Sequence, residues 1–508
     1  MNVTDRKQRL YVAAQGEKLR NGQISRRQFL QRAALAGFGI SAAGMMRMST
    51  AHAAATPIID RDRLHQTAQS DLQKWLKDVG GKFKGQTVRI ASESTAPSQI
   101  TSDLAAKQFI EVTGIDVKWE QMPLDQVLSK ITQDTATESP SNDIYYLDQS
   151  WLGRFVEDTV DPMEYMNNKG SELNFPGYDW NDFIPELVPA IDAYQGRLLG
   201  VPFDIPIFIM VYRKDVLDKL GLKVPTTMKE YLEAIQAVQK AGLKNADGSQ
   251  IYGTAGQWKS GHYALQCDWT AWLWSHGGSH FGKDKKITIN DDAAIAGANY
   301  MLELGKAMPS GATTWDWSGQ GDAITQGLAA FAIHWGEFFP GFDVPDKSKV
   351  VGLMETADLP KEDALRTKDE TSFDEVPGIG HQGGSCLAIS KYSKVKDAAW
   401  IFLQWATSKE TMIAAAAQSN TPVRQSTFDA PEIKEKAKVV AGTTRHFPAI
   451  LKAIKTRMGT EPHFPGWATV SSTGGPIPTE LGKMTTGAQD AKTTLNNIAK
   501  AIEEGLKE

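Results

Sequence analysis

Carboxylate and amide side chains stand where three predicted extended segments end. Two of these segments, residues 86–91 and 142–147, are followed within two residues by an acidic residue, and a third acidic residue stands between two apolar runs. The residues placed in this way are Glu93, Ser94, Asp148, Gln149 and Asp204. Loops at the carboxyl ends of strands bind ligands in α/β proteins. Carboxylates placed there could accept hydrogen bonds from a hydroxylated small molecule, or serve as the two catalytic carboxylates of a glycosidase.

A second group of candidates comes from the later part of the chain. It combines indoles, which cover the C–H face of a sugar ring, with an amide, a glycine and a guanidinium that can donate hydrogen bonds. Its members are Trp269, Trp335, Gln382, Gly383 and Arg424. For Trp335, ligand contact and core packing both remain open. Asp204 fits a ligand contact or a hinge salt bridge, because a charge between apolar runs must be paired or used.

Motifs of the common catalytic and cofactor sites are missing from the sequence. There is no G-x-S-x-G, H-E-x-x-H or Walker A pattern. Gly378–Gly383 matches G-x-G-x-x-G but precedes a predicted strand, whereas a dinucleotide fingerprint follows one and opens a helix. The nine histidines are scattered, and Cys267 and Cys386 are predicted to be buried free thiols rather than a disulfide. We therefore expect no metal and no cofactor.

Length and composition exclude several classes of protein. The chain has 508 residues, of which 41% are hydrophobic and 23% charged, which is typical of a globular protein of two or three domains. No apolar run reaches the roughly 18 residues needed to span a bilayer. The formal net charge of −5 argues against nucleic acid as a partner.

The first 53 residues differ from the rest in charge. They hold nine basic and two acidic residues, a net of +7, so the remainder carries −12. Ser25–Leu30 (SRRQFL) is a twin-arginine pattern, a glycine-broken apolar stretch follows over 33–46, and Ala51–Ala53 (AHA) is a signal-peptidase site. We predict a twin-arginine signal peptide over 1–53, cleaved after Ala53, and a periplasmic protein that is not a lipoprotein. The alternative is a basic amphipathic helix that stays attached.

Helices and strands alternate in the part of the chain that follows. A strand–helix–strand–helix–strand order with short links predicts a parallel sheet covered by helices. The predicted helices are 61–79, 97–112, 124–135, 215–220, one from a capping box at 227–230 to 241, 263–275, one capped by Asp291 or Asp292, one capped by Ser393 that buries Trp400 and Trp405, and 487–505. The predicted strands are 86–91, 115–120, 142–147, 197–202, 207–212, 330–334, 350–354 and 385–390.

One stretch carries a specific resemblance. Gly196–Ile235 resembles the family-1 extracellular solute-binding proteins of ABC importers, the group that includes maltose-binding protein. The shared pattern is a G-x-x-x-G-V-P turn from Gly196 to Pro202, then Tyr212 to Asp215, Gly221-Leu222, Pro225 and Thr227 to Glu230. Arg213 and Met228 depart from the usual Asn and Trp. Two later stretches, 384–400 and 418–424, resemble the family's next motifs in the right order.

The resemblance implies an α/β, two-lobed periplasmic-binding-protein fold of type II, with a ligand cleft between lobes joined by hinge strands. On this basis we expect the first lobe over 54–200, the hinge crossing and second lobe over 201–390, and a helical segment over 391–508 that completes both lobes. The implied function is capture of a saccharide, polyol or related polar solute for an ABC permease, by a monomer without catalysis. Arg424 also leaves room for an acidic or phosphorylated solute.

Two other classes remain open from the sequence. A secreted carbohydrate-active enzyme, a glycoside hydrolase or lyase, would use the carboxylates for catalysis. A cofactor protein exported already folded is the other, although the sequence offers no ligand set for a cofactor.

Overall fold

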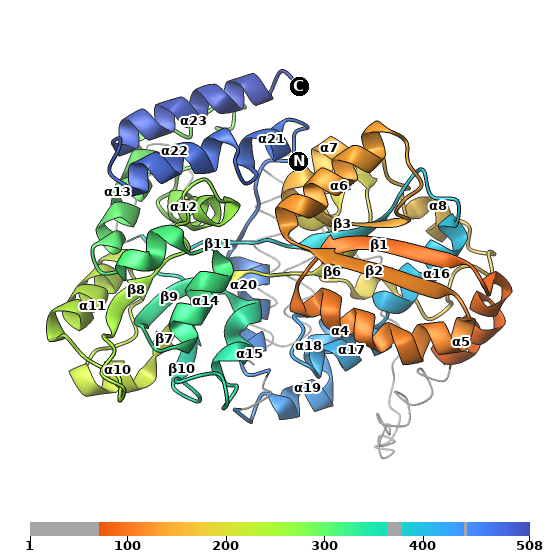
Figure 1. Ribbon diagram of the computed structural model, residues 1–508, viewed down its shortest axis with the longest axis horizontal. Helices are drawn as coiled ribbons and strands as arrows, with labels where there is room; N and C mark the ends of the chain where they lie inside the picture. Colours follow the sequence, from red (N-terminus) through yellow and green to blue (C-terminus); the bar gives the residue numbers. More distant parts are fainter. Residues whose placement is uncertain (1–70, 363–377, 441–443) are drawn as a thin grey trace, which may run out of the picture. The chain divides into compact units, whose positions relative to one another are not determined.

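The computed structural model describes residues 71–362, 378–440 and 444–508 (Figure 1). The predicted signal peptide and its cleavage site at Ala53 lie outside the described residues. Of the helix predicted over 61–79, the described part is helical over 71–78. Within the described ranges, no helix combines the length and the apolar character needed to cross a membrane.

The first sheet has five strands in the order β2-β1-β3-β12-β6. Its strands are β1 (Thr87–Glu93), β2 (Asp116–Met122), β3 (Ile144–Asp148), β6 (Val201–Asp204) and β12 (Ser385–Ile389). Strands β1, β2 and β3 are parallel, as their alternation with helices predicts, and β12 runs antiparallel to both of its neighbours. All five residues of β3 are buried, because the sheet is covered on both faces. The carboxyl ends of β1, β3 and β6 therefore carry Glu93, Asp148 and Asp204.

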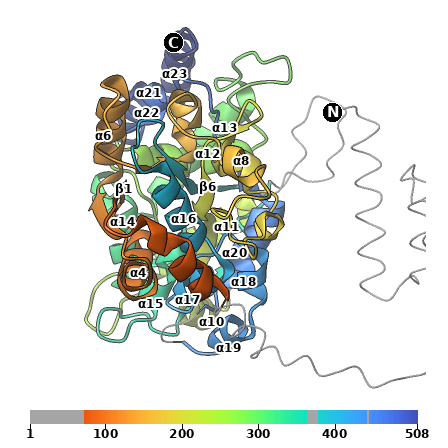
Figure 2. The same ribbon diagram turned by 90° about the vertical axis from the view of Figure 1, so that its right-hand side faces the viewer.

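Helices from two distant parts of the chain cover this sheet and form the first lobe with it. Helix α16 packs on β12 and α4 on β2, and both lie on the side that faces the viewer in Figure 2. Trp400 and Trp405 of α16 are fully buried, as predicted. The helices are α4 (Ala96–Ala105), η3 (Ala106–Ile110), α5 (Glu111–Thr113), α6 (Leu124–Ala136), η4 (Gln149–Trp151), α7 (Leu152–Phe155), α8 (Met163–Met166), α9 (Val188–Ile191), α16 (Lys396–Ala406), α17 (Lys409–Ala416), α18 (Gln425–Asp429) and α19 (Pro431–Lys436).

The second sheet has four strands in the order β10-β7-β9-β8. They are β7 (Phe208–Arg213), β8 (Tyr252–Ala255), β9 (Ala329–Trp335) and β10 (Met354–Ala357). Only β8 and β9 are parallel. The second lobe's helices are α10 (Lys214–Leu220), α11 (Met228–Ala241), α12 (Tyr263–Ser275), α13 (Asp292–Gly305), α14 (Trp317–Thr325) and α15 (Phe339–Phe342).

Three connections join the two sheets. The first runs from β6 to β7 through 205–207, and the second from β11 (Gly380–His381) to β12. The third contains β13 (Met458–Gly459), which pairs with β11, and leads from α20 (Phe447–Thr456) to the last helices. Of those helices, α22 (Pro476–Thr485) packs on α12 and α23 (Ala491–Gly505) on α13 of the second lobe (Figure 1). The short α21 (Trp467–Ser471) packs on α22 and α23 and also on η4 and α7 of the first lobe.

Four local predictions differ from the structure. The strand predicted over 197–202 is interrupted: β5 (Arg197–Leu198) pairs with β4 (Ala193–Tyr194) in a separate two-stranded sheet, and β6 begins at Val201. The strand predicted over 350–354 is β10, which begins at Met354 because its pairing with β7 sets the register. Ser393 does not cap α16; its hydroxyl donates to Asp143, and Val395 is the N-cap. The last helix begins at Ala491 instead of residue 487, because Gly487 has a left-handed backbone (φ 78°) and Asp490 caps the helix.

The capping box at the start of α11 is present as predicted. Thr227 Oγ1 accepts from the Glu230 amide at 3.2 Å, and Glu230 Oε2 accepts from the Thr227 amide at 3.2 Å. We expect Thr227→Ala to lower the free energy of unfolding by about 1 kcal/mol, measured by urea denaturation. Thr227→Ser keeps the acceptor and serves as the control. Equal destabilisation by both variants would contradict the capping role.

Candidate functional site

A cavity of about 250 Å³ is lined by residues of both lobes. From the first lobe come the end of β1, the start of α4 and the end of β3; from the second come the first residues of α12 and α14 and the end of β9. Its walls are formed by Glu93, Ser94, Thr95, Ala96, Leu124, Asp148, Pro206, Tyr263, Trp317, Ser318, Trp335, Glu337, Phe338 and Gly383. Pro206 and Gly383 belong to two of the connections between the sheets, so the cavity lies beside the hinge.

Half of the candidates from the sequence meet at this cavity. The five that line it are Glu93, Ser94, Asp148, Trp335 and Gly383. Gly383 has a steric role, because a Cβ there would lie 3.2 Å from Cη2 of Trp335. Trp335 is held on its other side by Phe208, with ring centroids 4.1 Å apart, and its Nε1 donates to Gln257 Oε1 at 3.1 Å. The indole is thus both packed and presented to the cavity.

Three further candidates lie just behind the wall, fully or almost fully buried. Asp204 accepts from the hydroxyl of Ser385 and, at 3.2 Å, from that of Tyr146; the described residues form no salt bridge with it. Gln149 Nε2 donates to the Tyr263 hydroxyl at 3.3 Å. Gln382 holds the second connection, since its Nε2 donates to the carbonyl of Ala190 at 3.3 Å.

Trp269 and Arg424 do not line the cavity. Trp269 lies one and a half turns beyond the start of α12 and is fully buried in the second lobe's core, where it packs against His280. The Arg424 guanidinium sits 3.8 Å from the Phe183 ring centroid and donates to the carbonyls of Thr407 and Asp179, each at 2.6 Å. Its Nε and Nη1 are therefore used within the first lobe, and because the buried guanidinium does not line the cavity, it offers no contact there to the acidic solute that Arg424 suggested.

Sequence reasoning missed several wall residues. Tyr263 is the first residue of α12, Trp317 the first of α14, and Glu337 and Phe338 belong to the 3-10 helix η7 (Gly336–Phe338) directly after β9. Glu337 and Phe338 follow the same strand end as Trp335, so extending that loop by three residues would have found them. The two helix starts carry no comparable signal.

Burial dominates the electrostatics of the carboxyl groups at the site. It raises the pKa of Asp148 to about 7, although hydrogen bonds from Ser150 oppose the rise. Burial likewise raises the pKa of Asp204 to about 7 and, with the charge of Asp204 adding to it, that of Glu337 to about 8. The pKa of Glu93 is raised well above its usual value by burial and then by the charges of Glu337, Asp204 and Asp148. These groups are close enough to oppose one another's ionisation.

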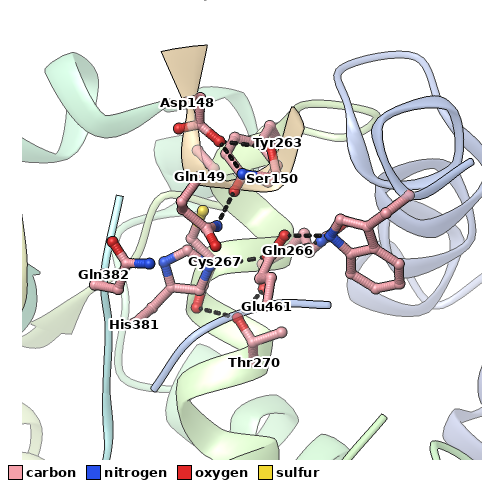
Figure 3. Close-up of polar contacts among 12 residues, drawn as sticks. Asp148, Gln149, Ser150, Tyr263, Gln266, Cys267, Thr270, His381, Gln382 and Glu461 are labelled. Atoms are coloured by element: carbon pink, nitrogen blue, oxygen red, sulfur yellow. Dashed lines mark hydrogen bonds and ion pairs between the residues drawn. The ribbon is translucent and has the colours of Figure 1, made fainter. Parts of the chain in front are cut away.

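A buried polar network adjoins the cavity (Figure 3). Its centre is Glu461, which follows β13 and accepts from Gln266 at 2.9 Å, from His381 at 2.9 Å and from Trp467 at 2.7 Å. Burial opposes ionisation of Glu461, but the hydrogen bond and charge of His381 outweigh it, so the pKa is lowered. The network joins α12 to the second and third connections between the sheets, and Tyr263 links it to Gln149 of the first lobe.

Comparison with known proteins agrees with this geometry. The model of the bacterial extracellular solute-binding protein family matches residues 105–441, about two thirds of the chain. The chain belongs to this family. The fold of this solute-binding protein is also that of a crystallised ABC transporter solute-binding protein of Agrobacterium radiobacter K84 in complex with ribitol, with a TM-score of 0.70, 24% identity, and coverage of 84% of this chain and 99% of the other.

Two sequence relatives cover most of their own length. A Sinorhizobium fredii protein named "probable amino-acid ABC transporter periplasmic-binding protein" is 21% identical over 77% of this chain and 84% of the relative. The erythritol/L-threitol-binding protein of Mycolicibacterium smegmatis is 22% identical over 68% of this chain and 72% of the relative. The family is one of solute-binding proteins, and this chain has their type II fold, so the comparisons support the binding prediction and not the enzyme alternative.

We expect this solute-binding protein, without solute, to lose stability between pH 6.5 and 8.5. Carboxyl groups with raised pKa bind protons more tightly folded than unfolded, so unfolding becomes easier as pH rises through their folded pKa values. Buried histidines with lowered pKa values, such as His280 at about 4, act in the opposite sense, but only below about pH 6.5. Above that pH the carboxyl groups decide the sign.

About half of this loss of stability can be assigned to Glu337. Urea unfolding should show a loss of about 2 kcal/mol over the interval, of which Glu337→Gln removes about half. A variant at the exposed Glu186, Glu186→Gln, is the control and should follow the parent. A parent protein equally stable at both pH values would contradict the assignment.

Proposed function

We propose that this protein is the solute-binding component of an ABC importer and holds a sugar or polyol in the cavity between its lobes, for delivery to a membrane permease. The observation that carries the proposal is the composition of the cavity wall. Carboxyl groups from both lobes line the cavity together with two indoles of the second lobe, Trp317 and Trp335. Carboxylates accept pairs of hydroxyl protons, and indole faces cover C–H surfaces, which together suit a polyhydroxylated molecule.

The relatives support a hydroxylated solute. Ribitol occupies the Agrobacterium protein, and the Mycolicibacterium protein is named for erythritol and threitol. A free amino acid, the solute named for the Sinorhizobium relative, fits less well. Its α-carboxylate would enter a cavity whose described wall residues include three carboxyl groups and no lysine or arginine. Burial of the carboxylate without a compensating cation would oppose its binding.

Location and assembly complete the proposal. The twin-arginine pattern and the site at Ala53 support export of a folded chain to the periplasm, where it would act as a monomer. We propose that 54–200 form the first lobe, 201–390 the hinge crossing and second lobe, and 391–508 a segment that contributes helices to both lobes. Strands β6 and β12, at the two ends of the middle segment, pair into the sheet of the first lobe. Replacing Arg26 and Arg27 by lysine should leave the precursor in the cytoplasm, detected by fractionation. Unimpaired export would contradict the twin-arginine route.

The function is tested by thermal shift on the chain that begins at residue 54. Sugars, polyols, sugar phosphates and amino acids are screened, and hits are checked by calorimetry and for chemical turnover. A sugar or polyol should raise the melting temperature, by the equivalent of about 2.7 kcal/mol at a hundred times Kd. It should also shrink the particle in solution scattering, since hinge closure traps the solute. Turnover of the solute, or binding of amino acids alone, would overturn the proposal.

A further inference from the structure

The charge of the cavity wall is unbalanced. Glu93, Asp148 and Glu337 line it, Asp204 lies directly behind, and none of the wall residues that the structure describes is a lysine or an arginine. The adjacent groove, which shares Glu93 and Trp317 with the cavity, is lined by Lys259. That lysine is paired with Asp316 at 3.2 Å, so it does not neutralise the cavity.

The carboxyl groups differ in the number of hydrogen bonds that the protein donates to them. Asp148 accepts from the amide and hydroxyl of Ser150, and Asp204 from two hydroxyls. Glu337 has no such support: its Oε2 is inaccessible to solvent and has no hydrogen-bond donor among the described residues. Because a carboxyl oxygen that is closed off from water and has no donor is costly, its retention at the cavity wall indicates that a donor arrives with the solute.

Aromatic rings complete the surroundings. Tyr263, Trp317, Trp335 and Phe338 also line the cavity. Their faces attract cations as well as C–H groups, and the attraction is strongest where water is excluded. Burial raises the pKa of these carboxyl groups, and a cation among them would favour their ionised form. Carboxyl groups without a neighbouring lysine or arginine in the described wall, combined with aromatic faces, therefore favour a cation over a neutral molecule of the same size.

We propose that the solute carries a positively charged nitrogen on its hydroxylated frame, as an aminated sugar or polyol does, and that Glu337 together with Glu93 or Asp148 binds this nitrogen. The inference rests on the proposed function and narrows it. Hydroxyl groups of the frame then meet the remaining carboxylate oxygens, and the rings cover its C–H faces. A phosphorylated or acidic solute fits less well, because no lysine or arginine among the described wall residues would pair with its charge.

Matched pairs of probes test the inference. Each pair exchanges one hydroxyl for a protonated amine: serinol against glycerol, D-glucosamine against D-glucose, and D-glucamine against sorbitol. Calorimetry at pH 7 should show at least one aminated member binding tenfold tighter than its neutral partner. Tighter binding of every neutral partner, or no binding of any aminated member, overturns the inference. If only the neutral members bind, the inference about the amine fails but the proposed function, binding of a sugar or polyol, stands. The failure of the inference can thus be told from the failure of the proposed function.

Variants assign the recognition to the carboxylates. Glu337→Gln keeps the size of the side chain but removes its charge, and should lower the preference for the amine over its neutral partner about tenfold. The preference, a ratio of two affinities, would not change if Glu337 only shaped the wall. Glu186→Gln, at an exposed site outside the cavity, is the control, and Glu93→Gln is a second variant should the first fail to fold. An unchanged preference in both folded variants overturns the assignment.

Discussion

Replacing Trp335 by alanine should weaken binding of the solute found by the screen by about fiftyfold, or roughly 2–3 kcal/mol. The indole forms part of the cavity wall and is locked by the Phe208 ring, by the hydrogen bond to Gln257 and by the close approach of Gly383. A solute stacked on it therefore meets a surface whose position is already fixed. Truncation removes the stacking surface and leaves a hole beside the solute, and calorimetry measures the loss.

Two further variants separate stacking from structural damage. Trp335→Phe keeps a ring in place and should lose less than tenfold in affinity. Gly383→Ala leaves the indole intact but places a methyl group 3.2 Å from it, so the ring must shift and affinity should fall by an intermediate amount. If Trp335→Ala remained folded and bound the solute as tightly as the parent, the indole would not be a contact.

The part of the site that could be predicted from sequence lies at the ends of strands. Glu93 and Asp148 follow buried parallel strands, and the rule that ligands bind at the carboxyl ends of such strands places both at the cavity. Trp335 follows from the same rule. The reason is local: an apolar run ending in a polar residue marks a strand end whatever the rest of the chain does.

Helices gave no such signal. Within α12 the sequence favoured Trp269, but Tyr263 at the first position reaches the cavity. Six residues separate them, about 9 Å along the helix axis, so only the first turn faces the solute. All but one residue of this helix are buried, so hydrophobic periodicity could not distinguish the face against the core from the end at the cavity.

In the fold, too, the sequence predicts local features and misses long-range pairings. Parallel pairing of β1, β2 and β3 follows from their alternation with helices. The insertion of β12 between β3 and β6 does not, because it joins segments more than 180 residues apart. Arg424 is a case where the missing long-range contact misled the prediction: a guanidinium in a polar loop suggested a solute contact, whereas the fold delivers Phe183 and two carbonyls to it.

Glu461→Ala should lower the free energy of unfolding by about 3–5 kcal/mol. Nothing in the sequence singles out this residue, since its partners His381 and Gln266 are 80 and 195 positions away. Glu461 and its partners are buried. Alanine at position 461 therefore leaves the donors of Gln266, His381 and Trp467 without their acceptor. Urea unfolding at pH 7 measures the change in midpoint, with the slope unchanged.

The matched variant Glu461→Gln tests whether the acceptor or only the packing matters. Glutamine keeps the shape and one acceptor oxygen, so it should cost clearly less than alanine, although it replaces an ionised partner of His381 by a neutral one. A loss below about 1 kcal/mol for alanine would show that water replaces the missing oxygens. This network ties α12 to two of the three connections between the sheets. A large loss of unfolding free energy would therefore show that the hinge is stabilised by polar contacts beside the solute cavity, and not only by the packing of the two lobe cores.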